Sequence, residues 1–160
     1  MNFKIWKTVF LGVHKSARIY QNALVNADFR IGNRTNDLLN KIPISQFKIR
    51  VDLAIASVFE LGFDKPMRFR EIFCRIKELG GQLCFAEVGP ACREAYPEQP
   101  NQEDLWIAME PISDSDGDLR IFKIIHGGSG RYLESNRIDL DFVCLGDSRF
   151  VFMLPRKSQK

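Results

Sequence analysis

Three aspartates at alternate positions are the residues with the clearest chemical potential in this chain. They are Asp114, Asp116 and Asp118, in the stretch "ISDSDGDLRIF". A calcium-binding loop of this appearance has oxygen ligands at positions 1, 3 and 5, a glycine at position 6 and a glutamate at position 12. If the first aspartate takes position 1, position 12 is Ile125, and if Gly117 takes position 6, position 12 is Lys123. Neither residue could close the ring of ligands, so we predict no metal site here.

A hairpin turn explains more of the same stretch. Asp-Gly is favoured at the two central positions of a primed two-residue turn, because both positions need positive φ. With Asp116-Gly117 in these positions, Glu110 faces Lys123 across the strands as an opposite-charge pair. This register also directs four apolar residues to one face, namely Ile107, Met109, Phe122 and Ile124. We therefore interpret the stretch as a turn.

The other motifs with catalytic potential are incomplete. "HGGSGRY" resembles part of a nucleophile elbow, but the fifth position of that motif is Arg131 rather than glycine. No Lys-Ser or Lys-Thr follows these glycines, so they do not form a phosphate loop either. Only His14 and His126 could serve Ser–His or Cys–His chemistry. We predict a hairpin turn here, and no catalytic residue, cofactor or metal ligand anywhere in the chain.

The four cysteines do not have the spacing of a structural zinc site. They are Cys74, Cys84, Cys92 and Cys144. None belongs to a C-x-x-C pair, which zinc sites commonly use. Cys74 falls on the predicted apolar face of a helix and Cys144 within an apolar strand. Reduced, buried thiols are expected, because free cysteine behaves as a small core residue.

Positive charge is concentrated at the start of the chain, although the net charge is only +3. Residues 1–50 contain nine Lys or Arg and two Asp, a net charge of +7. Such asymmetry can mark a surface that faces a polyanion, or the solvated sides of separate helices. The candidate polyanion-binding residues are Lys4, Lys7, Lys15, Arg18, Arg30 and Arg34.

The elements that must position these residues change in kind near residues 96–104. Before that point the pattern predicts one strand, over Lys4–Leu11, and then helices: from an N-cap at Ser16 to Ala27, from Asn33 or Thr35 to before Pro43, over Val51–Leu61, over Phe69–Leu79, and over Pro90–Tyr96. The β-branched residues of Val51–Leu61 would also suit a buried strand. After residue 104 the pattern predicts strands, ending in a hairpin in which "DFVCL" and "RFVFML" flank "GDS".

These elements predict an α+β protein, with a helical N-terminal two-thirds packed on a C-terminal antiparallel β-meander. We expect one domain over 1–160: residues 1–96 mainly helical with an N-terminal strand, residues 105–155 antiparallel strands, and residues 156–160 a basic tail. The longest apolar run, "LAIASVF", is much shorter than the ~20 residues of a membrane-spanning helix. The N-terminal stretch does not have the pattern of a signal peptide. A cytoplasmic protein without membrane contact is expected.

Three linked segments carry a resemblance to known sequences. They are "AEVGPACREAY", "LWIAMEPISDSDGDL" and "RFVFMLPRK". Together they resemble an uncharacterised group of small bacterial proteins, over about Ile31 to Lys157. No activity comes with that group, so the resemblance implies a small bacterial cytosolic protein and assigns no site residue.

The sequence therefore favours a non-enzymatic binding or regulatory protein that acts on a protein partner. Two alternatives stay open. Helices at Val51–Leu61, Phe69–Leu79 and Pro90–Tyr96, followed by a hairpin, have the order of a winged helix-turn-helix, which would bind nucleic acid. The many carboxylates would also permit an enzyme that uses two of them as acid and base.

Overall fold

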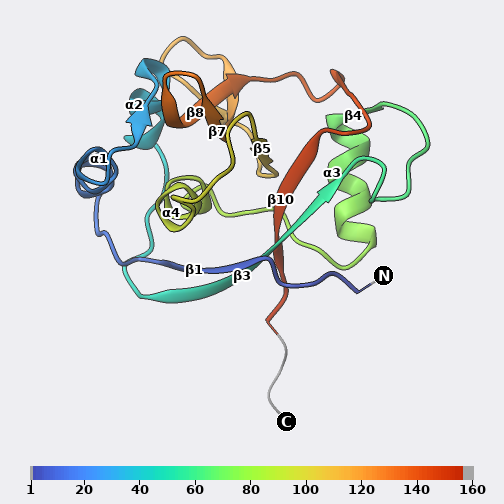
Figure 1. The fold of residues 1–160 in the computed structure, drawn as a ribbon, viewed down its shortest axis with the longest axis horizontal. Helices are drawn as coiled ribbons and strands as arrows, with labels where there is room; N and C mark the ends of the chain where they lie inside the picture. Colours follow the sequence, from blue (N-terminus) through green and yellow to red (C-terminus); the bar gives the residue numbers. More distant parts are fainter. Residues whose placement is uncertain (1, 157–160) are drawn as a thin grey trace.

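The computed structural model describes residues 2–156, which form four helices, one large sheet and one small ladder (Figure 1). All but the first residue of the predicted tail at 156–160 lie outside the described residues. The helices are α1 (Ala17–Asn26), α2 (Asn33–Leu39), α3 (Phe69–Glu78) and α4 (Val88–Ala95). The strands of the large sheet are β1 (Lys7–Leu11), β2 (Arg30–Ile31), β3 (Ile49–Ser57), β5 (Asp104–Ile107), β6 (Ile112–Ser113), β7 (Leu119–Gly127), β8 (Gly130–Arg137) and β10 (Arg149–Leu154). The ladder pairs β4 (Met67–Arg68) with β9 (Val143–Cys144).

The large sheet is mixed, and its strand order does not follow the chain. The order is β1-β3-β10-β5-β7-β8-β2, with β6 paired to β7 beside this path. The β10–β5 and β2–β8 pairs are parallel, and the other pairs are antiparallel. The C-terminal strand β10 therefore joins the N-terminal pair β1–β3 to the central strands β5, β7 and β8.

The predicted architecture is wrong. The N-terminal two-thirds is not a helical layer, because β1, β2, β3 and β4 all belong to it. The C-terminal strands are not an antiparallel meander, because β10 lies between β3 and β5 and runs parallel to β5. Both errors have the same cause: the pairing that places β10 is between residues far apart in the chain, which local periodicity does not report.

The helix predicted over Val51–Leu61 is strand β3. Its apolar residues fit helical spacing, but they also fill both faces of a strand, with Leu53 on one face and Ala54 on the other. Pairing with β1 on one side and β10 on the other satisfies the backbone of β3 and decides the conformation. A strand buried on both faces shows no polar alternation, so its period does not distinguish it from a buried helix.

The helix that this strand replaces was also the first helix of the predicted winged helix-turn-helix. With β3 in its place, residues 51–96 do not contain the three successive helices that this motif requires. Arg93, the cation of the presumed recognition helix, is fully buried. It donates hydrogen bonds to the side-chain oxygen of Gln99 and to three backbone carbonyls, those of Tyr96, Ile125 and Tyr132. Burial lowers its pKa to about 10.

The hairpin predicted between "DFVCL" and "RFVFML" does not form. β9 contains only two residues and pairs with β4, whereas β10 pairs with β3 and β5. Phe59 lies over Gly146, so close that a Cβ at Gly146 would meet its ring at 2.1 Å. The glycine that marked a turn in the sequence therefore also accommodates an aromatic ring from a distant segment.

Several local predictions are confirmed. β1 falls within the predicted strand, and Ser16 caps α1 by accepting a hydrogen bond from the Ile19 amide. α3 buries four of the five residues of the predicted apolar stripe, namely Phe69, Ile72, Phe73 and Ile76, whereas the fifth, Leu79, is its C-cap and only partly buried. The caps predicted at Asn33 or Thr35 are wrong, because α2 begins at Asn33 after Gly32 and has no side-chain cap. These elements depend on residues only a few positions apart, which explains why patterns found most of them.

The helices leave part of one sheet face uncovered. α3 packs on the face of β10 that carries Phe150, whose ring meets Phe69 and Phe73 edge to face. α4 packs against β1, and Figure 1 shows α3 on one side of β10 and α1, α2 and α4 on the other. Beyond the C-terminal end of α3, the face that it covers continues to Leu154 and Asp52, which pair across β10 and β3. Among residues 2–156, no helix is long and apolar enough to cross a membrane.

Candidate binding site

The aspartate loop is a hairpin turn, as predicted, but in a different register. β6 and β7 pair Ile112 with Arg120 and Ser113 with Leu119, one residue away from the predicted partners. The loop is therefore longer than a two-residue turn, and the Asp114 amide donates to the Asp118 carbonyl at 2.8 Å. Gly117 has φ +84°, so the need for glycine is confirmed. The predicted cross-strand pair of Glu110 and Lys123 is wrong.

Lys123 belongs to a different pair. It lies opposite Trp106, with its ammonium group 4.2 Å from the ring centroid, and forms an ion pair with Asp104 at 2.7 Å. The apolar face expected from the predicted register nevertheless exists: Ile107, Met109, Phe122 and Ile124 are all buried. The observed register of the turn differs from the predicted one, so the strand partners differ. These four residues are buried all the same, because β7 pairs over more residues with β5 than with β6.

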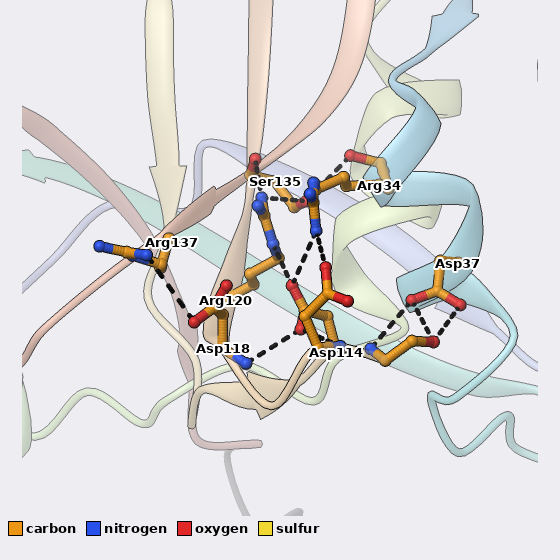
Figure 2. A network of polar contacts seen from close by, with 10 residues as sticks. Arg34, Asp37, Asp114, Asp118, Arg120, Ser135 and Arg137 are labelled. Carbon is orange, nitrogen blue, oxygen red and sulfur yellow. Dashed lines mark hydrogen bonds and ion pairs between the residues drawn. The ribbon is translucent and has the colours of Figure 1, made fainter.

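Asp114 organises the loop from inside (Figure 2). It is 4% exposed; one carboxylate oxygen accepts from the Asp116 and Asp118 amides, both at 2.9 Å, and the other accepts from Arg120 Nε at 2.8 Å. The Arg120 hydrogen bond lowers the pKa of this carboxyl group below its usual value. The carboxylate that would have begun a calcium site is therefore already bound by protein donors.

The other carboxylates of the loop point to protein partners as well. Arg34 pairs with Asp116, and Arg137 approaches Asp118 at 3.8 Å. The Ser115 hydroxyl lies 2.8 Å from both carboxylate oxygens of Asp37, and the Ser115 amide also donates to Asp37 at 3.2 Å, which ties α2 to the loop (Figure 2). Among the described residues, no group of three or more His, Cys, Asp or Glu side chains could hold a metal ion.

The glycine-rich stretch after β7 is a hairpin turn, as predicted. β7 and β8 pair up to Gly127 and Gly130, with no helix after the serine. His126 lies opposite Arg131 at this end of the hairpin, and its Nδ1 is 2.7 Å from the Gln99 carbonyl oxygen. Ser129 hydrogen-bonds the Tyr132 hydroxyl, so the histidine and the serine have separate partners.

The cysteines are free thiols, and three of them are buried. Burial raises the pKa of Cys92 to about 12, that of Cys144 to about 11, and that of Cys84 as well. The prediction of burial is wrong for Cys74, which is exposed beside Glu78 on α3. Cys74 lies five residues after Phe69, and this spacing rotates it off the apolar stripe.

A buried glutamate that the sequence analysis did not single out holds two loops together. Glu87 is 1% exposed and accepts three hydrogen bonds, from the Gly12 amide at 2.7 Å, the Ser45 amide at 2.8 Å and the Tyr20 hydroxyl at 2.5 Å. The loop after β1 and the segment before β3 are thus attached to the start of α4. Burial of the Tyr20 side chain and its hydrogen bond to Glu87 raise the pKa of Tyr20.

Exposed apolar side chains lie on the two loops held by Glu87 and on the adjoining strand ends, and we call them the Phe47 patch. They are Val13 and Phe47 of the loops, with Phe10 of β1 and Ile49 of β3 on opposite faces of the strand pair. Phe47 is 79% exposed, more than any other large apolar side chain described. Its backbone is close to Gly12, where a Cβ would meet the Phe47 carbonyl oxygen at 2.1 Å. A glycine with φ +74° is therefore required for the two loops to meet.

Cations surround this patch. Lys48 lies over the Phe10 ring at 4.6 Å, and Arg50 is the cross-strand partner of Phe10. Lys15 donates to the Gln46 carbonyl oxygen at 2.8 Å, which brings its charge beside Phe47. His14 interacts with the other side of the loop, where its Nε2 is 2.9 Å from Glu94 Oε1.

The six predicted polyanion-binding residues occupy different surroundings. Lys7 pairs with Glu98 at 2.6 Å, and Arg34 pairs with Asp116 in the aspartate loop. Arg30 lies against Gly130, and Lys15 borders the Phe47 patch. Lys4 and Arg18 are exposed. These contacts place the six residues in separate surroundings, and polyanion binding by the six stays a prediction.

A cleft lies on the uncovered part of the sheet face, and we call it the terminal cleft. Its volume is about 700 Å³. Its lining comes from the N-terminal segment, the end of α3, and the adjoining ends of β3 and β10: Asn2, Phe3, Ile5, Arg50, Asp52, Leu79, Gly80, Leu154, Pro155 and Arg156. The cleft contains neither histidine and only one carboxylate, that of Asp52.

Comparison with known proteins adds no identity to this geometry. No family model, no curated protein and no solved structure matches the chain. The resemblance to an uncharacterised bacterial group therefore stays a prediction, and arguments about function have to come from the surfaces described above.

Proposed function

We propose that this chain is a non-enzymatic binding protein that acts through protein contacts, and that the Phe47 patch is its contact surface. The observation that carries the proposal is the presentation of Phe47. Its ring is 79% exposed, yet the adjoining segment is fastened by the hydrogen bond from the Ser45 amide to Glu87. Exposed apolar groups that cluster with polar residues at their edge are typical of protein interaction sites. A backbone segment held in place before binding loses less conformational freedom when a partner covers it.

The charges around the patch define the partner. Lys15, Lys48 and Arg50 provide positive charge beside exposed aromatic and aliphatic side chains. A complementary surface would carry Asp or Glu together with apolar residues. We therefore propose that the partner presents an acidic segment with interspersed large apolar side chains.

The polar groups with catalytic potential support a binding role over an enzymatic one. His14 contacts Glu94, and His126 contacts the Gln99 carbonyl oxygen. Glu87 and Asp114 each accept three hydrogen bonds from the protein itself. A carboxylate that serves as a general base needs a free position toward its substrate. A carboxylate-based enzyme is therefore the weaker alternative.

The nucleic-acid alternative is motivated by the same surface, because exposed aromatic side chains beside cations also bind single strands. Its distinguishing property is salt dependence. Each phosphate contact contributes roughly 0.7 to the slope of log affinity against log salt for a single strand, and about 0.9 for duplex DNA. Contact with an acidic protein segment depends less steeply on salt where apolar burial supplies much of the affinity.

A displayed library of random peptides of about 12 residues tests the proposal without knowledge of the natural partner. We expect selected peptides to be enriched in Asp and Glu together with Leu, Phe or Trp. Their affinity should fall by about tenfold or more for Phe47→Ser and for Lys48→Glu. Phe142→Ser is the matched control, because Phe142 is also an exposed phenylalanine and lies outside the patch.

Three outcomes would contradict the proposal. Selected peptides could lack acidic residues, or they could bind Phe47→Ser as tightly as the natural chain. Labelled single-stranded or duplex DNA could bind at physiological salt, with a steep salt slope and sensitivity to Lys48→Glu, which would establish the nucleic-acid alternative. Thermal unfolding of every variant should match that of the natural chain, because the substituted side chains are exposed.

A further inference from the structure

The terminal cleft combines an apolar wall with unpaired positive charge. Phe3 meets Phe152 edge to face at 4.8 Å, which fixes the N-terminal segment as one wall. Ile5, Leu79 and Leu154 add apolar surface around the cleft. Volumes of roughly 300–1,000 Å³, mainly apolar linings and a few polar groups are typical of small-molecule sites. At about 700 Å³, the cleft is large enough for such a ligand.

Arg50 forms an ion pair with the Asp52 carboxylate in the cleft, and Arg156 also lines the cleft. Arg50 Nε donates to Asp52 Oδ1 at 3.3 Å, and the same oxygen accepts from the Thr8 hydroxyl at 2.7 Å. These hydrogen bonds, together with the charges of Arg50 and Arg156, lower the pKa of Asp52, so the carboxylate is ionised at neutral pH. Within residues 2–156, Arg156 and the two Nη groups of Arg50 donate no hydrogen bond to the protein. Among residues 2–156, the lining of the cleft therefore carries two positive charges and one negative charge.

We propose that the terminal cleft binds a small amphipathic anion, with a carboxylate, phosphate or sulfonate head between Arg50 and Arg156 and an apolar body against Phe3, Ile5 and Leu79. A planar guanidinium with free Nη groups can bind such a head through two parallel hydrogen bonds. An inorganic anion would leave the apolar part of the lining exposed to water, whereas an apolar body would cover it, which is favourable. This site is independent of the Phe47 patch, although Arg50 lies near both.

Binding of dodecanoate, measured by calorimetry and by chemical-shift changes of backbone amides, tests this inference. A ligand of this size in a shallow site should have a dissociation constant on the order of 0.1 mM. We expect the largest shifts at Leu79, Gly80 and Leu154, and at least about tenfold weaker binding of dodecanol and of acetate, each of which lacks one half of the ligand. Dodecyl phosphate and dodecanesulfonate, below their micelle concentrations, distinguish among the three head groups.

Variants separate the head from the body. Arg156→Gln and Arg50→Gln should each weaken dodecanoate binding by about tenfold, with little effect on dodecanol. Ile5→Asn should weaken both, and Ile5 is 54% exposed, so the fold should tolerate the change. Arg137→Gln is the matched control, because Arg137 is an exposed arginine of β8 outside the cleft.

The inference is overturned if dodecanol and dodecanoate bind equally, if the shifts lie outside the cleft, or if Arg156→Gln leaves the affinity unchanged. Binding weaker than about 1 mM would also overturn it. Phe47→Ser should leave dodecanoate binding intact, and Arg156→Gln should leave peptide binding intact. Failure of one site therefore does not decide the other.

Discussion

The Tyr20 hydroxyl donates a 2.5 Å hydrogen bond to Glu87, and the same carboxylate accepts the Gly12 and Ser45 amides. One buried side chain at the start of α4 thus connects α1, the loop after β1 and the segment before β3. The proposed contact surface depends on this connection, because Val13 and Phe47 follow Gly12 and Ser45 closely in the chain. The rigidity of the Phe47 patch is therefore determined in the core.

Glu87→Gln should destabilise the fold and loosen the patch. A carboxylate can accept from three donors, whereas an amide in its place directs two N–H groups at the existing donors. We expect a loss of about 1–3 kcal/mol in the free energy of unfolding, measured in urea. Amide exchange should accelerate at Gly12 and Ser45. Glu94→Gln is the control, since the side chain of Glu94 hydrogen-bonds His14 at the surface, and an equal loss in both variants would contradict the role of Glu87.

Gly117→Val should destabilise the aspartate loop through backbone strain. Gly117 has φ +84°, but a Cβ at this position would meet no atom within 4 Å. The left-handed conformation costs roughly 1–2 kcal/mol for a residue with a side chain, and more for a β-branched one. Gly127→Val is a matched control, because Gly127 is equally open and lies in strand β7, where valine is favoured. If the two variants unfold at the same urea concentration, the strain at Gly117 is not significant.

Calcium should not stabilise the protein. Arg120 and two backbone amides bind the Asp114 carboxylate, and Arg34 pairs with Asp116. A micromolar site would add about 4 kcal/mol at millimolar calcium through mass action. We expect identical thermal unfolding with calcium and with a chelator. An increase in melting temperature that Asp114→Asn removes would show that the loop is a calcium site after all.

Acid should destabilise the fold partly through Asp114. The Arg120 hydrogen bond lowers its folded pKa, so the ionised group stabilises the protein above its unfolded pKa of about 3.9. That stabilisation is lost as the pH falls through the lower folded pKa. Asp114→Asn should reduce stability at pH 7 and flatten the decline of the unfolding free energy as the pH falls below about 4. Asp147→Asn, which changes an exposed aspartate outside the loop, should leave both unaltered; if Asp114→Asn behaves in the same way, the interaction with Arg120 contributes little.

Local chemistry in the sequence by itself determined several features of this protein. Ser16 was identifiable as a cap because the amide whose hydrogen bond it accepts is three residues away, at Ile19. The apolar stripe of α3 was identifiable because its residues recur at the spacing of one helix. The requirement for glycine at position 117 was also predictable, since positive φ is a property of one residue. In each case the interacting groups lie within a few residues, so spacing in the chain reports spacing in the structure.

Tertiary structure alone decided the sheet and both proposed sites. β3 is a strand because β1 and β10 pair with it, and β10 comes from the far end of the chain. The same pairing brings Asp52 opposite Leu154 and creates the terminal cleft. Glu87 meets Gly12 across 75 residues, and no periodicity connects these two positions. The hydrogen-bond partners of these backbone and side-chain groups come from distant parts of the chain. A pattern over a few neighbouring residues does not show which distant residues will pair.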